Sequence, residues 1–202
     1  MNTLVNSLAI VFSPKKGWSR IGENPGTLAG LIALHTIPLA LIPAVCWYFG
    51  VSHFGWSVAG ENVRLTAESA LPVCVLFFLA LIYAVLFLGY MVHWMAKSYK
   101  SDSTVTQGVA LITYAGTPFF IAGVLGLMPI LWLDIIVGIA VSCYCIYLLY
   151  LGTPHVMKVT SERGFLYSSA VFGIALVVFV GLLGATAILW SFGAAPEYVY
   201  AG

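Results

Sequence analysis

Long apolar stretches, with nearly all of the charge confined to the gaps between them, are the feature that most constrains this chain. Crossing the hydrocarbon core of a bilayer takes about 20 predominantly apolar residues. Asp, Glu, Lys and Arg make up only 7% of the 202 residues, against about 25% in an ordinary soluble domain. Since an α-helix satisfies its own backbone hydrogen bonds in lipid, the sequence predicts an all-α, polytopic membrane protein.

The apolar stretches predict five membrane spans. The connection between the third and fourth is so short that these two are expected to form an antiparallel hairpin. The predicted division is a cytoplasmic or interfacial N-terminal segment (1–26), a five-span membrane domain (27–192) and an external C-terminal tail (193–202). The spans are Thr27–Gly50, Ser69–Ala96, Gly108–Leu127, Leu131–Gly152 and Leu166–Phe192.

The Lys and Arg residues predict the orientation of these spans. Loops on the cytoplasmic side of a membrane carry an excess of Lys and Arg. With the N-terminus in the cytoplasm, Arg64 is the only one of the eight that falls outside, which predicts a periplasmic C-terminus. The other seven fall inside: Lys15, Lys16, Arg20, Lys97, Lys100, Lys158 and Arg163.

The N-terminal segment from Leu4 to Ile21 combines apolar residues with a basic cluster. This combination is typical of a helix that lies in the membrane interface against anionic headgroups. The alternative is a tail without fixed structure. Proline interrupts helical hydrogen bonding, so Ser13-Pro14 predicts two short pieces rather than one helix.

Asp134 is the one carboxylate that falls clearly inside a predicted span, near its outer end. Two interpretations stay open. An acid in the first turn of a helix is stabilised by the helix dipole and caps free N–H groups. Alternatively, charges within spans often contact a proton, a cation or a substrate.

Further polar or helix-breaking residues lie in the first, third and fourth spans. A histidine beside proline kinks either bonds a neighbouring carbonyl or acts as a protonatable switch. Small residues and prolines in the other two spans indicate either a closely packed, kinked helix pair or the lining of a substrate or lipid groove. The candidate residues are His35, Tyr114, Gly116, Thr117, Pro118, Gly152 and Pro154.

Several classes of function lack support in the sequence. The net charge of +1 gives no basic surface for nucleic acid. The four histidines show no metal-ligand spacing, and Cys143 and Cys145 point apart on a helix. No nucleophile stands beside a base. We therefore expect a non-enzymatic protein with no cofactor, no metal and no nucleic-acid partner.

Several short motifs occur along the whole chain in a particular order. They are Phe12-Ser13-Pro14, residues 94–99 (WMAKSY), 114–118 (YAGTP), 147–154 (YLLYLGTP) and 162–165 (ERGF). Their order and spacing resemble the Yip domain family, and within it the bacterial YohC-like inner membrane proteins. The resemblance implies an integral membrane protein of the bacterial inner membrane. Eukaryotic members bind Rab-type GTPases and carry an Asp-Leu-Tyr-Gly-Pro type motif in their cytoplasmic N-terminal region, and this chain lacks that motif before its first span.

Two functions from different classes remain. The first is an adaptor or scaffold that binds membrane lipids, a membrane protein partner or a second copy of itself. The alternative is a transporter or channel for an ion, lipid or small solute, which needs a polar pathway through the membrane. Asp134, His35, Tyr114 and Thr117 would contribute to that pathway, although no inverted repeat is evident.

Overall fold

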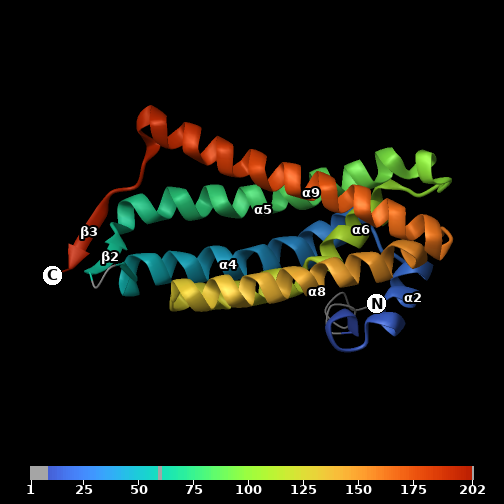
Figure 1. The fold of residues 1–202 in the computed structure, drawn as a ribbon, viewed down its shortest axis with the longest axis horizontal. Coiled ribbons are helices and arrows are strands. Elements are labelled where there is room, and N and C mark those ends of the chain that lie inside the picture. The colour runs from blue at the N-terminus through green and yellow to red at the C-terminus, as the bar shows by residue number, and fades with distance from the viewer. Residues whose placement is uncertain (1–8, 59–60, 202) are drawn as a thin grey trace.

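The computed structural model describes residues 9–58 and 61–201. Long helices lie side by side along the longest axis of the molecule (Figure 1). The first span is built of α3 (Leu28–Leu31), the π-helical turn η1 (Ile32–Thr36), α4 (Ile37–Phe49) and η2 (Gly50–Phe54). The other long helices are α5 (Ala67–Met95) with η3 (Ala96–Tyr99), α8 (Leu131–Met157), and α9 (Ser161–Leu189) with η5 (Trp190–Ala194).

The third span is broken. It consists of α6 (Val105–Ala115), α7 (Thr117–Ala122) and the 3₁₀ turn η4 (Gly123–Leu127). The two parts are bent by 41° at Gly116. Counting this bent pair as one crossing gives five spans, and the all-α, polytopic fold class is confirmed.

Threonine side chains set the start of three spans. Thr27 Oγ1 accepts a hydrogen bond from the N–H of Gly30 at 3.1 Å, and Thr66 Oγ1 accepts one from Ser69 at 3.2 Å. Thr104 forms a reciprocal capping box with Gln107 before α6. Such caps satisfy backbone donors that a helix leaves free at its N-terminus.

The fourth and fifth spans are longer than the sequence predicts. α8 continues through Pro154 to Met157, where Lys158 ends it in the left-handed conformation (φ 53°). A proline inside a helix removes a single N–H donor, so its presence in the last turn does not stop the helix. α9 likewise begins at Ser161 rather than at Leu166.

A small antiparallel sheet closes one end of the bundle, where the sequence predicts only a loop and a free tail. Its strands, in spatial order, are β1 (Trp56–Val58), β2 (Glu61–Leu65) and β3 (Tyr198–Ala201). The C-terminal segment is held there, because the N–H of Glu197 donates to Ser69 Oγ at 3.1 Å and the N–H of Thr66 donates to the Glu197 carbonyl at 3.2 Å.

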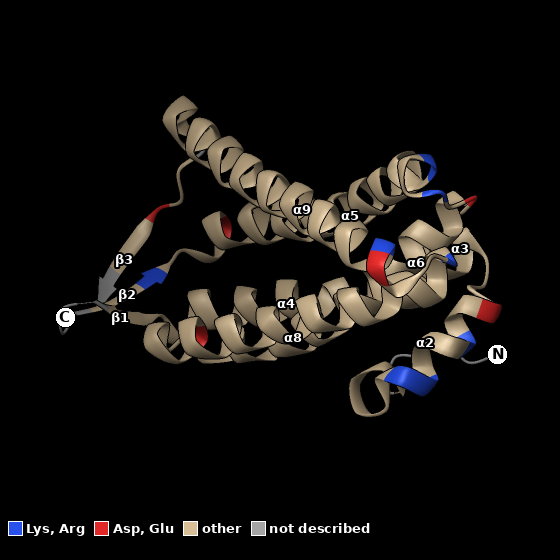
Figure 2. Ribbon diagram, turned by 45° about the vertical axis from the view of Figure 1, so that its right-hand side comes forward, with Lys and Arg blue, Asp and Glu red and all other residues tan. Residues whose placement is uncertain are grey.

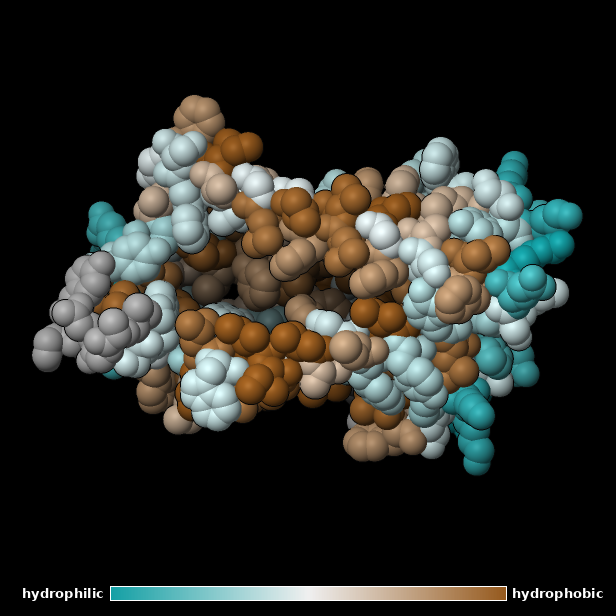
Figure 3. Space-filling model, viewed as in Figure 1, coloured by the Kyte–Doolittle hydropathy of each residue, from teal (hydrophilic) through white to brown (hydrophobic). Residues whose placement is uncertain are grey.

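The two ends of the bundle differ in charge (Figure 2). The end that carries α2 (Pro14–Glu23) holds most of the Lys and Arg residues, and we call it the basic end. The opposite end, which carries the strands, has Arg64 as its one Lys or Arg residue and is called the sheet end. Between them the surface in view is largely apolar (Figure 3), as a lipid-facing belt requires.

The main hydrophobic core lies toward the basic end. The largest buried cluster joins residues of the N-terminal segment to α5, α6, α8 and α9, with Trp18, Leu148 and Tyr167 fully buried. On α9 the buried residues all lie in its first part: Gly164, Tyr167, Ser168 and Val171. Beyond them α9 diverges from α5, and the surface beneath it is hollowed (Figures 1 and 3).

Candidate functional site

Close approaches of small residues bring the first and third spans together. A side chain on Gly123 would collide with Pro43 of α4. One on Gly126 would place its Cβ 2.6 Å from Cδ1 of Trp47. Gly50 likewise lies against the backbone of Gly126. Gly123 and Gly126 of the third span therefore face the first span, whereas the sequence predicts that the closely packed pair is formed by the third and fourth spans.

A cluster of polar side chains lies between the same two spans. His35 and Thr36 lie in the π-helical turn of the first span and are 1% and 0% exposed. Tyr114 of the third span places its ring edge-on to the imidazole, with centroids 4.6 Å apart at 75°. Thr117 Oγ1 lies 3.5 Å from His35 Nε2. Three of the predicted candidates, His35, Tyr114 and Thr117, therefore form one site.

Two further threonines complete this polar cluster, which we define as His35, Thr36, Thr113, Tyr114 and Thr117. The hydroxyl oxygens of Thr36 and Thr113 are 3.4 Å apart, and both side chains are fully buried. Sequence analysis did not identify Thr36 as a candidate. The one sequence signal for Thr36 was its position beside His35, because a π-helical turn has no clear sequence pattern. Such turns often occur at functional sites.

Gly116 and Pro118 shape this site without contributing polar side-chain atoms. Gly116 lies at the junction of α6 and α7, and the nearest atom to a Cβ built there is the Ile112 carbonyl oxygen, at 3.2 Å. Pro118 lacks an N–H donor. The hydroxyl of Thr117 donates to the Thr113 carbonyl at 3.2 Å, beside the break.

Gly152 and Pro154 belong to a separate contact at the basic end. A Cβ on Gly152 would lie 2.5 Å from the indole of Trp18 in α2, and one on Gly164 of α9 would lie 2.6 Å from Pro154. Gly22 of α2 lies close to the carbonyl of His155. These small residues therefore let α2 and α9 pack directly on α8.

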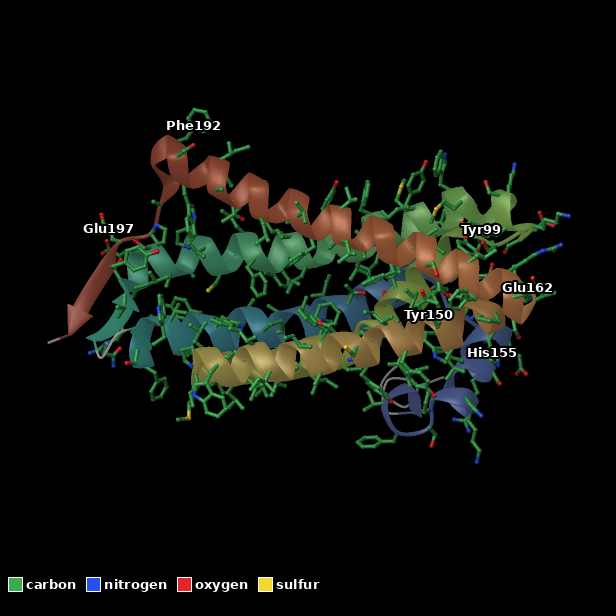
Figure 4. All side chains as sticks on the ribbon, viewed as in Figure 1. Tyr99, Tyr150, His155, Glu162, Phe192 and Glu197 are labelled. Carbon is green, nitrogen blue, oxygen red and sulfur yellow. The ribbon has the colours of Figure 1, made fainter. Side chains whose placement is uncertain are left out.

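The polar side chains at the basic end also join neighbouring elements. Ser168 donates to Thr153 Oγ1 at 2.8 Å, and the ring of Tyr167 stacks on Tyr99, with centroids 4.5 Å apart. Ser101 of the loop before α6 donates to the Met157 carbonyl at 2.6 Å. Tyr99, Tyr150, His155 and Glu162 are seen at this end in Figure 4.

Asp134 lies in the first turn of α8, at the sheet end, away from the polar cluster. Its own N–H already donates to the Ile130 carbonyl at 2.9 Å. Within residues 9–58 and 61–201 the structure records no hydrogen bond or ion pair of its carboxylate. The structure therefore does not bring Asp134 and His35 together.

The cluster has the chemistry of a hydrogen-bonding site rather than of a metal site. In the described part of the chain, no three His, Cys, Asp or Glu side chains are grouped to hold a metal ion. What the cluster offers instead is one imidazole and four hydroxyl groups inside a membrane domain.

Comparison with known proteins identifies the family. The Yip1 domain matches residues 8–182, which is most of the chain and includes every residue of the polar cluster. The chain belongs to the Yip1 family. The expectation drawn from the short motifs is thereby confirmed.

Two curated relatives are similar over nearly their whole length. The inner membrane protein YohC of Escherichia coli strain K12 is 30% identical over 181 residues, which cover 89% of this chain and 93% of the relative. The YohC protein of Escherichia coli O6:H1 strain CFT073 gives the same values. No solved structure matches this Yip1 family member.

Proposed function

We propose that this protein is a non-enzymatic scaffold of the bacterial inner membrane that binds anionic lipid headgroups at its basic end, which faces the cytoplasm. Its membrane location is supported by the five apolar spans and by the inner-membrane relatives. Protein partners, or a second copy of the chain, would assemble on this lipid-bound platform.

The observation that carries the proposal is the fixed position of α2. One side of this helix is buried through Gly17, Trp18, Ile21 and Gly22. Upstream of α2, the hydroxyl of Tyr144 in α8 donates to the Val11 carbonyl at 2.8 Å. The segment is thus fastened to the bundle by both apolar and polar contacts.

The opposite side of α2 presents its cations outward. Lys15, Lys16 and Arg20 are all exposed. Each Lys or Arg near an anionic membrane surface contributes about 1 kcal/mol of attraction. Because α2 is already ordered, binding of headgroups would not have to offset the entropy of folding the segment.

The loops at the same end add to this charge. Lys97, Lys100, Lys158 and Arg163 are exposed there, against the acids Glu23, Asp102 and Glu162. The excess of cations supports binding of an anionic surface rather than of a neutral one.

Lipid retention tests the proposal. The triple variant K15Q/K16Q/R20Q should retain several-fold less phosphatidylglycerol than the unsubstituted protein when both are purified and examined by native mass spectrometry. The variant K15R/K16R/R20K keeps the charge and should retain the lipid fully. Equal retention in all three proteins would contradict the proposal.

Cysteine labelling tests the orientation. In a cysteine-free background, a cysteine at Ser161 should react from the cytoplasm and one at Asn62 from the periplasm, as the distribution of Lys and Arg predicts. Reaction of both positions from the same side would contradict the arrangement of spans.

The polar cluster favours a second candidate function, transport of an ion or small solute. Ionisable residues inside membrane domains often mark transport pathways. Ion or proton flux in proteoliposomes, compared with protein-free liposomes, separates the two. Flux that depends on the protein would favour the transporter over the scaffold.

A further inference from the structure

The hydrogen bonds of the polar cluster fix which nitrogen of His35 carries the proton. The hydroxyl of Thr117 donates to the Thr113 carbonyl, so its single proton is already used. Its oxygen can then only accept from His35 Nε2. The neutral ring therefore carries its proton on Nε2 and a lone pair on Nδ1.

The same reasoning shows that the other hydroxyl groups are already engaged. Thr36 donates to the Leu31 carbonyl at 3.1 Å, so its oxygen accepts the proton of Thr113. His35 Nδ1, in contrast, is buried and has no hydrogen-bond partner in the described residues. Buried polar atoms in proteins are normally paired, so this lone pair is the acceptor of the ring that remains to be paired.

The residues of the first and third spans favour a proton over a metal ion as the ligand of His35 Nδ1. A metal ion needs several His, Cys or carboxylate ligands, and neither the first nor the third span contains an Asp or Glu. A proton needs a single lone pair. The proton comes from the aqueous phase, forms an N–H bond at Nδ1 and converts the ring to imidazolium, while Nε2 keeps its bond to Thr117.

Tyr114, on α6, is the titratable group that directly faces the ring. α7 contributes none. Titratable groups on the neighbouring spans include Cys46 and Tyr48 about three turns further along the first span, Cys74, Tyr83, Tyr90 and His93 on α5, and Cys145 on α8 beside Phe119. The structure records no hydrogen bond or ring contact between any of them and His35 in the described residues.

The position of the site connects proton binding to the shape of the third span. A charged ring in an apolar interior is unfavourable unless water or a carbonyl reaches it. Thr117, the partner of the ring, lies at the break between α6 and α7. We propose that His35 binds a proton at Nδ1 and that this binding changes the bend between α6 and α7, an activity beyond the proposed scaffold function.

Nuclear magnetic resonance of the full chain in lipid nanodiscs tests proton binding directly. With ¹⁵N-labelled histidine, the Nδ1 signal of His35 should move from the value of an unprotonated nitrogen toward that of a protonated one as the pH falls from 8 to 4. Single Gln substitutions of His53, His93 and His155 assign the His35 signal without altering the site.

Spin labels test the conformational half of the proposal. Labels at the exposed positions Asp102 and Val124, in a cysteine-free background, report the distance across the bend. That distance should change over the pH range in which His35 titrates, and should not change in His35→Gln.

Two threonine variants sharpen the test. Thr117→Val removes the acceptor of Nε2–H and should move the titration to lower pH, whereas the exposed Thr160→Val should leave it unchanged. A His35 ring that stays neutral at pH 4 would overturn proton binding. Titration of His35 without a change in the label distance would overturn its coupling to the bend.

Discussion

The first third of α9 and the rest of the same helix are both apolar, yet they have different surroundings. The first third holds every buried residue of α9, and Ser168 and Tyr167 bond to other elements there. From Phe172 to Leu189 no residue is buried, and Val177 is 71% exposed. Phe192 projects from the far end (Figure 4).

This difference teaches that contact between spans follows small and polar residues rather than hydropathy. Lipid tails are as apolar as leucine, so close packing and hydrogen bonds hold helices together in a membrane. On the glycines of the outer part of α9, however, an added Cβ would have no atom within 4 Å. A glycine therefore indicates helix contact only where a partner is present.

The largest expected effect comes from enlarging glycines at span contacts. Gly126→Leu should lower the free energy of unfolding by at least the 1–3 kcal/mol typical of overpacking, about the same for Gly123→Leu. Gly116→Leu should cost less, because its nearest neighbour is its own helix. The measurement is thermal stability in detergent.

The matched controls are Gly181→Leu and Gly184→Leu on the outer part of α9, which should be close to neutral. If Gly181→Leu and Gly184→Leu destabilise the protein as much as Gly126→Leu does, packed and lipid-facing glycines do not differ in the way proposed.

A smaller, local effect is expected from Trp18→Ala. Removing a fully buried tryptophan typically costs about 3–5 kcal/mol, but here the loss should fall on the docking of α2 rather than on the whole bundle. Hydrogen exchange of α2 should increase strongly, while that of α5 stays the same. Phe12→Ala, at a position 80% exposed, is the control; increased exchange in both would contradict specific docking.

Single hydroxyl groups on α9 should distinguish its two parts. Ser168→Ala removes the bond to Thr153 and should destabilise the protein by about 0.6 kcal/mol, a typical value for hydrogen bonds between membrane helices. Thr186→Ala removes only a bond to Leu182 of its own helix and should change stability less. Thermal denaturation of both variants measures the two effects. A larger loss of stability for Thr186→Ala than for Ser168→Ala would contradict this prediction.

The smallest effect is expected at Asp134. Because the structure records no partner for its carboxylate in the described residues, Asp134→Asn should leave stability nearly unchanged and should not alter any ion flux. A stably folded variant that loses a flux present in the unsubstituted protein would instead favour the transporter.

The sequence by itself determined the membrane class, the five crossings and the separation of charge between the two ends. These features depend on the composition and length of each segment, because bilayer thickness and backbone hydrogen bonding act on every span separately. The break at Ser13, before the helix that starts at Pro14, was predictable for the same local reason.

Only the tertiary structure decided which candidates meet. His35 and Thr117 are 82 positions apart in the chain and come together because the first and third spans cross at small residues. The pairing of the C-terminal strand with β2 likewise depends on where α9 ends relative to α5. Such contacts depend on how separate spans pack, and no local pattern in a single apolar helix specifies its neighbour.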